Sequence, residues 1–177
     1  MLRFAETQIA GAFLVETDEY RDERGGFSRL YCPEEFKRAG IDFSSTQINL
    51  SANPHRHTLR GLHFQPEPHA EAKFVRCLNG AIHDVIVDLR PESSSYLGHQ
   101  AFELSRENRL GLFVPEGCAH GFLTLREDCD ILYQMSRVYE PGYAAGYRYD
   151  DPAFAIAWPA PPAVIAQADL DWPAFAP

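Results

Sequence analysis

Short apolar segments separated by turn residues dominate the chain and predict β-strands. Residues 73–78 alternate polar with apolar side chains, and residues 81–89 form a β-branched run that ends at Arg90-Pro91. Residues 9–15 are apolar around a glycine, and three further apolar segments at 110–114, 122–125 and 131–135 are bounded by Pro, Gly, Asp or Glu. Strands at roughly ten-residue spacing are typical of a sandwich or barrel rather than of βαβ units. We therefore predict one all-β domain over residues 1–177, built as a jelly-roll β-barrel.

Helical signals are scarce. The best candidate is residues 33–40, where Pro33 and two glutamates open the segment and Gly40 ends it, which predicts a helix of about two turns. We expect one or two such short helices. The chain after Pro152 is rich in Pro and Ala and contains Trp158 and Trp172. This C-terminal segment is too short for a domain and too aromatic for a free linker, so we expect it to pack back on the barrel.

Composition and charge indicate which kinds of molecule are disfavoured as partners of the protein. Apolar residues make up 45% of the chain and charged residues 23%, as in ordinary globular proteins. The net charge of −9 disfavours nucleic acid and anionic membrane surfaces as partners, because both are polyanions. No apolar run approaches the ~20 residues of a membrane span, and the N-terminus lacks the order of a signal peptide. We expect a cytoplasmic protein whose four cysteines, none in a C-x-x-C motif, are free thiols.

The stretch Arg60-Gly-Leu-His-Phe-Gln65 is the most unusual in the sequence. In a regular strand Arg60 and His63 would point to opposite faces. Charged groups among apolar neighbours need polar partners or must line a cavity. A lone histidine in a strand is more often structural than functional. The cluster of Arg60, His63 and, ten residues later, Lys73 favours a functional site.

Two more segments carry candidate chemistry. In residues 115–122 a turn delivers His120, flanked by small residues, to the start of a strand, where a ligand could approach closely. The alternative is a hairpin turn with an exposed histidine. Residues 130–135 contain Tyr133, and several tyrosines follow it, so position alone does not single it out.

A metal site is the alternative that the histidines raise. His55 and His57 stand two residues apart, and His63, His69, Glu71 and His120 could supply further ligands to a metal-dependent isomerase or dioxygenase. The pair flanks Arg56 in a polar segment, and a neighbouring guanidinium disfavours a cation. We expect no metal.

Seven blocks in order resemble the dTDP-4-dehydrorhamnose 3,5-epimerase family, which has a cupin (jelly-roll) fold. They are Asp22-Glu-Arg-Gly-Gly-Phe27, Gln47-x-Asn49-x-Ser51, residues 59–65, residues 71–76, residues 80–90, residues 119–122 with Tyr133, and Asp150-Asp-Pro152 with residues 156–159. The resemblance implies an isomerase that acts without metal or organic cofactor on nucleoside-diphospho-4-keto-6-deoxy sugars, above all dTDP-4-dehydro-6-deoxyglucose, and inverts carbons next to the ketone.

This chemistry requires a base, a group that stabilises the enolate oxygen and an acid on the opposite face of the ring. The resemblance implies that His63 is the base, that Lys73 steadies the enolate oxygen and that Tyr133 delivers the proton. A late aspartate, Asp169 or alternatively Asp171, would orient the imidazole. For this aspartate to reach His63, the C-terminal segment has to fold back on the barrel.

The resemblance also implies a set of substrate-binding residues and a partner. The set is Arg24, Phe27, Gln47, Asn49, Arg60 and His120. In the family's strand-exchanged homodimer, Gln47 and Asn49 would be lent by the partner subunit. A local cationic pocket inside an acidic protein would accept the pyrophosphate.

Three departures from the family pattern leave alternatives open. Arg29 stands where the family often has a Glu that helps hold thymine, so CDP- or GDP-linked sugars are alternatives. His57 replaces a usual Gly, and the chain is short after Asp171. Inversion of one carbon only, at C3 or C5, is a further alternative. A non-catalytic sugar-nucleotide binding module is disfavoured because the three residues assigned to the chemistry are all present.

Overall fold

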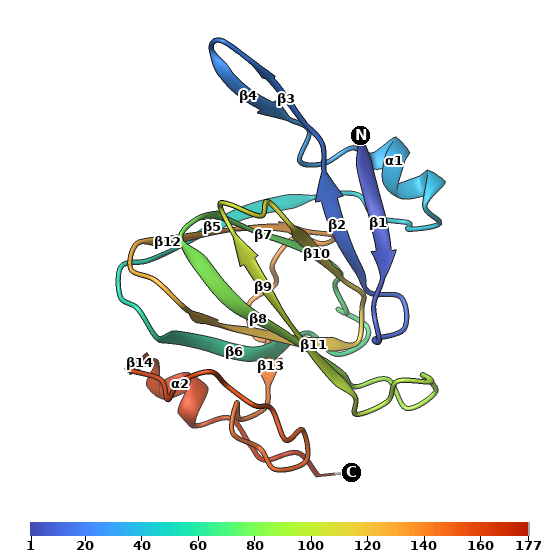
Figure 1. The fold of residues 1–177 in the computed structure, drawn as a ribbon. Coiled ribbons are helices and arrows are strands. Elements are labelled where there is room, and N and C mark those ends of the chain that lie inside the picture. Colours follow the sequence, from blue (N-terminus) through green and yellow to red (C-terminus); the bar gives the residue numbers. More distant parts are fainter. Residues whose placement is uncertain (177) are drawn as a thin grey trace.

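Two facing β-sheets form the body of the protein in a computed structural model that describes residues 1–176 (Figure 1). The first sheet consists, in spatial order, of β1 (Leu2–Glu6), β2 (Phe13–Thr17), β10 (Gly111–Val114), β7 (Lys73–Asn79), β12 (Cys129–Met135) and β5 (Gln47–Asn53). The second consists of β13 (Ala145–Gly146), β6 (Thr58–Phe64), β11 (Cys118–Thr124), β8 (Ala81–Asp88) and β9 (His99–Ser105), with β14 (Val164–Ile165) pairing parallel to β6. All other pairs are antiparallel.

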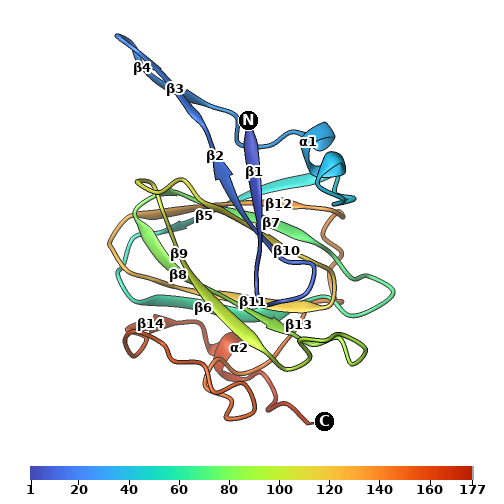
Figure 2. The same ribbon diagram turned by 45° about the vertical axis from the view of Figure 1, so that its right-hand side comes forward.

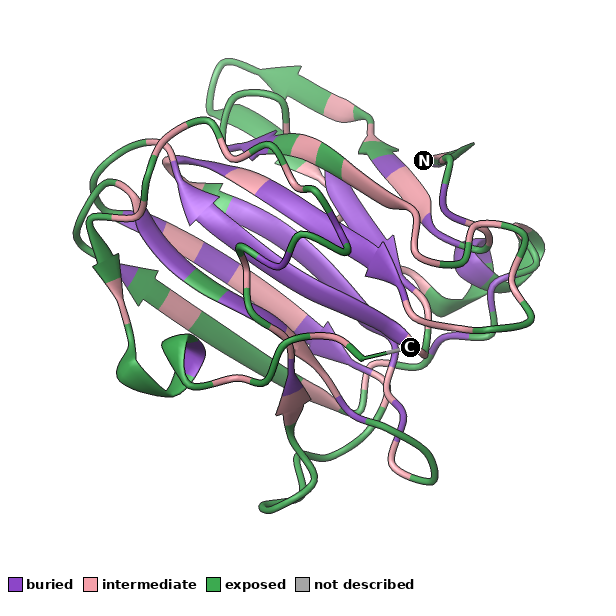
Figure 3. Cartoon of the chain, turned by 90° about the horizontal axis from the view of Figure 1, so that it is seen from below, coloured by how far each residue is buried: buried purple, intermediate pink, exposed green. Residues whose placement is uncertain are grey.

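The main core fills the space between the sheets. Val75 of β7 and Ile131 of β12 face Ile82, Ile86 and Phe122 of the second sheet, and all five are fully buried. The strands at the centre of Figure 3 are accordingly coloured as buried. The predicted all-β jelly-roll barrel is confirmed, because alternate residues of each central strand point into one shared core.

Two short helices complete the fold, as expected. The helix α1 (Pro33–Arg38) matches the prediction for residues 33–40, and α2 (Gln167–Leu170) lies in the C-terminal segment. Phe36 of α1 packs edge-on against Phe74, with ring centroids 5.0 Å apart, on the outer face of the first sheet. The prediction of one apolar strand over residues 9–15 is wrong at its start. Gly11 adopts a φ of +76°, so residues 9–11 form a turn and β2 begins at Phe13.

A two-stranded hairpin, β3 (Glu19–Asp22) with β4 (Gly25–Ser28), projects away from the barrel (Figures 1 and 2). We call residues 19–28 the arm. Its aromatic side chains are open to solvent, with Tyr20 70% and Phe27 77% exposed.

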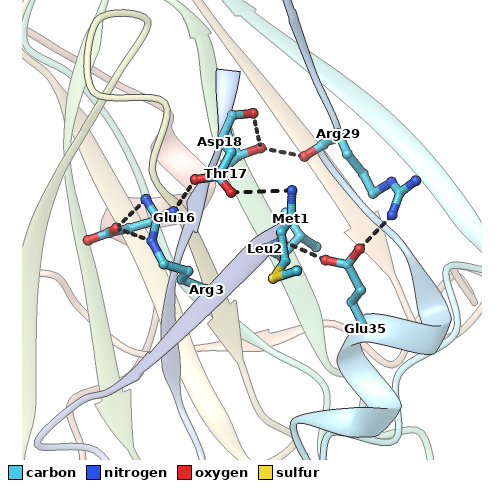
Figure 4. Close-up of polar contacts among 8 residues, drawn as sticks. All are labelled: Met1, Leu2, Arg3, Glu16, Thr17, Asp18, Arg29 and Glu35. Carbon is cyan, nitrogen blue, oxygen red and sulfur yellow. Dashed lines mark hydrogen bonds and ion pairs between the residues drawn. The ribbon is translucent and has the colours of Figure 1, made fainter. Parts of the chain in front are cut away.

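Polar contacts fix the root of the arm (Figure 4). The Glu35 carboxylate of α1 accepts hydrogen bonds from the Leu2 backbone N–H at 2.6 Å and from Arg29 Nη1 at 2.5 Å. The Thr17 hydroxyl donates to the Arg29 carbonyl at 2.6 Å. These bonds join the N-terminus, β2 and α1 at the point where the arm leaves the barrel.

The C-terminal segment folds back on the outer face of the second sheet, as predicted. Phe154 packs with Leu62 and Ala119, and Phe175 and Trp158 lie against this cluster. The four cysteines are free thiols. No helix within residues 1–176 is long and apolar enough to cross a membrane.

Candidate active site

A cavity of about 260 Å³ opens between the two sheets and brings together six residues that the sequence predicted for the site. Its lining consists of Asn49, Leu50, Ser51, Arg60, His63, Lys73, His120, Tyr133 and Met135. His63 and His120 come from the second sheet, whereas Lys73 and Tyr133 come from the first. The two histidines therefore face the lysine and the tyrosine across the cavity.

An irregularity in β6 places Arg60 and His63 in the same cavity. His63 pairs with His120 and Arg60 with Phe122, so three steps along β6 correspond to two along β11. This extra residue is a β-bulge, which reverses the alternation of side chains. The expectation that Arg60 and His63 point to opposite faces is therefore wrong.

Glycine is required at the bulge. Gly61 has a φ of +115°, and a Cβ there would lie 2.7 Å from both the Gly121 Cα and the His120 carbonyl oxygen. Because no L side chain fits this space, the small residues on both strands allow the close approach that shapes the site.

His63 is paired with the C-terminal Asp169. The His63 Nε2 lies 2.6 Å from Asp169 Oδ1, and the Gly61 backbone N–H donates to Oδ2 at 3.2 Å. Burial alone would raise the pKa of Asp169, but the hydrogen bonds that the carboxylate accepts outweigh it and lower the pKa. An ionised carboxylate here orients the imidazole and stabilises its cation. The alternative, Asp171, is exposed, directly follows α2 and accepts a hydrogen bond from Gln167 Nε2.

Lys73 brings a buried cation to the opposite wall. Its Nζ donates to the His63 carbonyl at 3.3 Å and lies 3.5 Å from Glu71 Oε1. Burial lowers the pKa of Lys73, and the charge of Glu71 opposes that shift. Glu71 was predicted only as a possible metal ligand, and its pairing with Lys73 was not foreseen from the sequence.

Tyr133 is set to keep its proton. Burial raises the pKa of its phenol, and the negative charge of Asp84 raises it further. Its ring lies 5.8 Å from that of His120, nearly perpendicular to it. A phenol in this setting is a neutral hydrogen-bond donor at physiological pH.

His120 is buried, so the alternative of an exposed histidine in a hairpin turn is wrong. Its side chain is 3% exposed, and its Nε2 lies 2.8 Å from Oδ1 of the fully buried Asp84. No sequence motif had singled out Asp84. The only signal was its acidic side chain within the β-branched run of residues 81–89.

Three predicted binding residues lie outside this cavity. Arg24 and Phe27 belong to the arm, where Arg24 Nη2 pairs with Asp22 Oδ2 at 2.5 Å. Gln47 begins β5 and donates from Nε2 to Asn49 Oδ1 at 3.0 Å. Asn49 lines the cavity of its own chain, because it pairs directly with Tyr133. The expectation that a partner subunit lends Gln47 and Asn49 stays a prediction, since the structure describes a single chain.

The residues of the metal alternative are dispersed. Within residues 1–176, no three His, Cys, Asp or Glu side chains lie close enough together to hold a metal ion. His55 and His57 lie in the loop between β5 and β6 and do not line the cavity. His69 is 2.6 Å from Glu140 and stacks on Tyr143.

Comparisons with known proteins point to one family. Residues 6–177 match the family described as dTDP-4-dehydrorhamnose 3,5-epimerase. The enzyme of that name from Methanothermobacter thermautotrophicus is 40% identical over 173 residues, which covers 96% of this chain and 92% of the relative.

Solved structures give the same result. The dTDP-4-dehydrorhamnose 3,5-epimerase of Bacillus anthracis, solved with TDP and PPi bound, is 34% identical with a TM-score of 0.96, covering 99% of this chain and 100% of that one. The Legionella pneumophila enzyme, in complex with dTDP-4-keto-L-rhamnose, is 31% identical with a TM-score of 0.90, covering 96% and 90%.

Proposed function

The chain belongs to the dTDP-4-dehydrorhamnose 3,5-epimerase family, an isomerase family, and we propose that it inverts C3 and C5 of a dTDP-linked 4-keto-6-deoxyhexose. The observation that carries this proposal is the placement of His63 and Tyr133 on opposite sheets, facing one cavity. Inversion needs a base on one face of the sugar ring and an acid on the other. The TDP and the dTDP-sugar in the solved relatives support thymidine as the nucleoside of the substrate.

His63 is the proposed base. Its Nε2 is hydrogen-bonded to Asp169, and the carboxylate stabilises the imidazolium that forms when the ring removes a proton from the carbon next to the C4 ketone. The electron pair of the broken C–H bond moves into the ring and gives an enolate with its negative charge on O4.

Lys73 is the proposed stabiliser of that enolate oxygen. A cation held in a largely water-excluded cavity acts far more strongly on developing charge than it would in water. Its side chain is only 8% exposed, and its contacts with the His63 carbonyl and Glu71 hold the ammonium beside the base.

Tyr133 is the proposed acid. Its raised pKa keeps the phenol protonated until the enolate carbon accepts the proton from the side opposite His63. The phenolate then recovers a proton from solvent, and His63 releases the one it removed. The same two groups serve each carbon next to the ketone, and every step uses side chains of this chain alone.

We propose that the nucleotide end of the substrate is held partly by a second subunit. The cavity, at about 260 Å³, is smaller than most ligand pockets, which measure roughly 300–1,000 Å³, and its rim residues Asn49 and Arg60 are exposed. The arm carries Arg24 and Phe27 away from their own cavity (Figure 1), so they are free to complete the site of a partner. In this proposed homodimer the partner lends its arm, whereas the sequence analysis expected the partner to lend Gln47 and Asn49.

Arg29 does not exclude thymidine. Its guanidinium pairs with Glu35 at the root of the arm (Figure 4) and so supports the arm's position instead of occupying a base pocket. We also propose that the whole chain forms one domain. We further propose a cytoplasmic location, which the four free cysteines support.

The test is solvent exchange in deuterium oxide with dTDP-, CDP- and GDP-linked 4-keto-6-deoxyhexoses. We expect the wild-type enzyme to introduce deuterium at C3 and C5 of the dTDP-sugar, and His63→Ala to lose this activity by at least about 100-fold, because the base is gone. NMR of the recovered sugar measures both. Absence of deuterium with all three substrates, or full activity of His63→Ala, would refute the proposal.

A further inference from the structure

Trp172 of the C-terminal segment sits on a glycine directly opposite His63. Gly146 of β13 pairs with His63 of β6. A Cβ at Gly146 would lie 2.5 Å from Trp172 Cε2 and 2.5 Å from the Leu62 carbonyl oxygen. The missing side chain at Gly146 thus makes room for the indole ring beside the strand that carries the base.

The indole touches both members of the His63–Asp169 pair. Trp172 Nε1 donates to Asp169 Oδ1 at 3.3 Å, the same oxygen that lies 2.6 Å from His63 Nε2. The rings of Trp172 and His63 have centroids 6.1 Å apart and planes at 70°, an edge-to-face contact.

The Asp169 carboxylate depends on such contacts for its orientation. It stands on α2, a helix of four residues. Up to residue 176, the strand pairing between the C-terminal segment and the barrel is limited to the two-residue strand β14. Gly61 donates to Oδ2, and the imidazole and the indole both approach Oδ1. Of these groups, Trp172 is the only one that comes from the C-terminal segment itself.

We propose that Trp172 is a positioning residue, which holds the Asp169 carboxylate and, through it, the His63 imidazole in the orientation that removes the substrate proton. The inference rests on the proposed role of His63 as the base. Trp172 does not line the cavity, so it acts on the chemical step rather than on substrate binding.

The chain offers a matched control, since its only other tryptophan lies in the same segment. The Trp158 indole N–H donates to the Tyr149 carbonyl at 2.9 Å, and its ring lies against His83, away from the cavity. We expect Trp172→Phe to lower kcat about tenfold, the effect of one hydrogen bond to a charged group, with KM within about twofold. Trp158→Phe leaves both constants unchanged. Equal kcat values in the two variants would overturn the proposal.

A spectroscopic readout separates positioning from general stability. In Trp158→Phe the only tryptophan is Trp172, and a protonated imidazole beside an indole quenches its fluorescence. We expect emission to fall as pH is lowered, with the same midpoint as the acid limb of kcat/KM. This step should vanish when His63→Asn is added and persist with His120→Asn. The ionisable groups that face His63 are Asp169 on α2, Arg60 on β6, Glu71 before β7, Lys73 on β7, His120 on β11 and Tyr133 on β12.

The outcomes distinguish this inference from the proposed function. If His63→Ala still exchanges and inverts the sugar, the assignment of the base is wrong. If His63→Ala is inactive but the emission step is absent or unaffected by His63→Asn, the base assignment stands and the role of Trp172 is refuted.

Discussion

Two aspartates on β8 show how the surroundings of one residue decide what it does. Asp84 and Asp88 are both fully buried and both point toward the barrel interior. Asp84 bonds His120 through Oδ1, whereas its Oδ2 has no partner in the described chain and its charge acts on Lys73 and Tyr133. Asp88 instead uses both oxygens, accepting hydrogen bonds from Arg90, Ser93 and Ser95. Asp84 therefore belongs to the electrostatics of the site, and Asp88 to the stability of the fold.

Asp88→Asn should destabilise the protein by roughly 3 kcal/mol at neutral pH, because it removes a fully buried carboxylate charge that pairs with Arg90 and accepts hydrogen bonds from Ser93 and Ser95. Burial would raise the pKa of Asp88, but its hydrogen bonds outweigh burial and lower the pKa well below the usual range. The folded pKa thus lies below the unfolded one, so the stabilisation is complete above the unfolded value of about 3.9 and is lost as pH falls through the folded value.

Urea unfolding of the wild type and Asp88→Asn across a pH series measures this directly. The difference in unfolding free energy should be constant near neutrality and shrink below about pH 4. A difference that stayed constant down to the lowest measurable pH would contradict the assigned ionisation.

Among the elements, the arm is the one whose proposed role depends on a second subunit. Residues 20–27 of the arm are exposed, whereas its ends are held by the pair of Glu19 with Arg109 and by the contacts of Glu35 and Thr17 with Arg29. The arm therefore extends from the barrel in a defined direction (Figures 1 and 4). A short hairpin with exposed aromatic side chains is only marginally stable by itself and is stabilised by packing against another surface.

Subunit complementation tests the exchange of arms. Arg24→Ala should lower activity at least about tenfold through the loss of a charge-assisted contact with the diphosphate. In a heterodimer with His63→Ala, one cavity combines an intact His63 with an intact partner arm. Random assembly of co-expressed subunits should therefore restore about a quarter of wild-type activity.

The matched control is the co-expression of His63→Ala with Lys73→Gln. Both of these residues belong to the cavity of their own chain, so every heterodimer cavity carries one defect and no recovery is expected. If Arg24→Ala and His63→Ala likewise fail to complement, the arm serves its own chain or no cavity at all.

At the scale of the whole molecule, the barrel places residues of both sheets around one cavity. The proposed base His63 and His120 come from β6 and β11, and Lys73 and the proposed acid Tyr133 come from β7 and β12. The C-terminal segment then supplies Asp169 from outside the second sheet. The opposed placement of the proposed acid and base therefore follows from the closure of the barrel and not from any single element.

Periodicity predicted much of this architecture. Alternation over residues 73–78 and the β-branched run at 81–89 correspond to β7 and β8, and Pro33 with Gly40 bounds α1. Family motifs then identified most of the cavity residues. These signals depend on residues close together in the chain, so a single sequence is enough to recognise them.

Features that depend on non-local contacts were missed. The bulge at Gly61 that brings Arg60 beside His63 depends on the close approach of Gly121 on another strand. The pairing of Asp84 with His120 and the seating of Trp172 on Gly146 likewise join residues from separate elements. Motif spacing also did not reveal that Asn49 pairs directly with Tyr133, because it does not show which strand a segment joins.

The most direct test of the two-sided mechanism is the ratio of exchange to inversion in Tyr133→Phe. Without the phenol, His63 still forms the enolate, and after exchange with solvent it returns a deuteron to the same face. We expect NMR to show deuterium in recovered substrate of unchanged configuration, while the inverted product falls at least about 100-fold below the wild-type level. Inversion by Tyr133→Phe at the wild-type rate would contradict the assignment of the acid and, with it, the account of two opposed sheets.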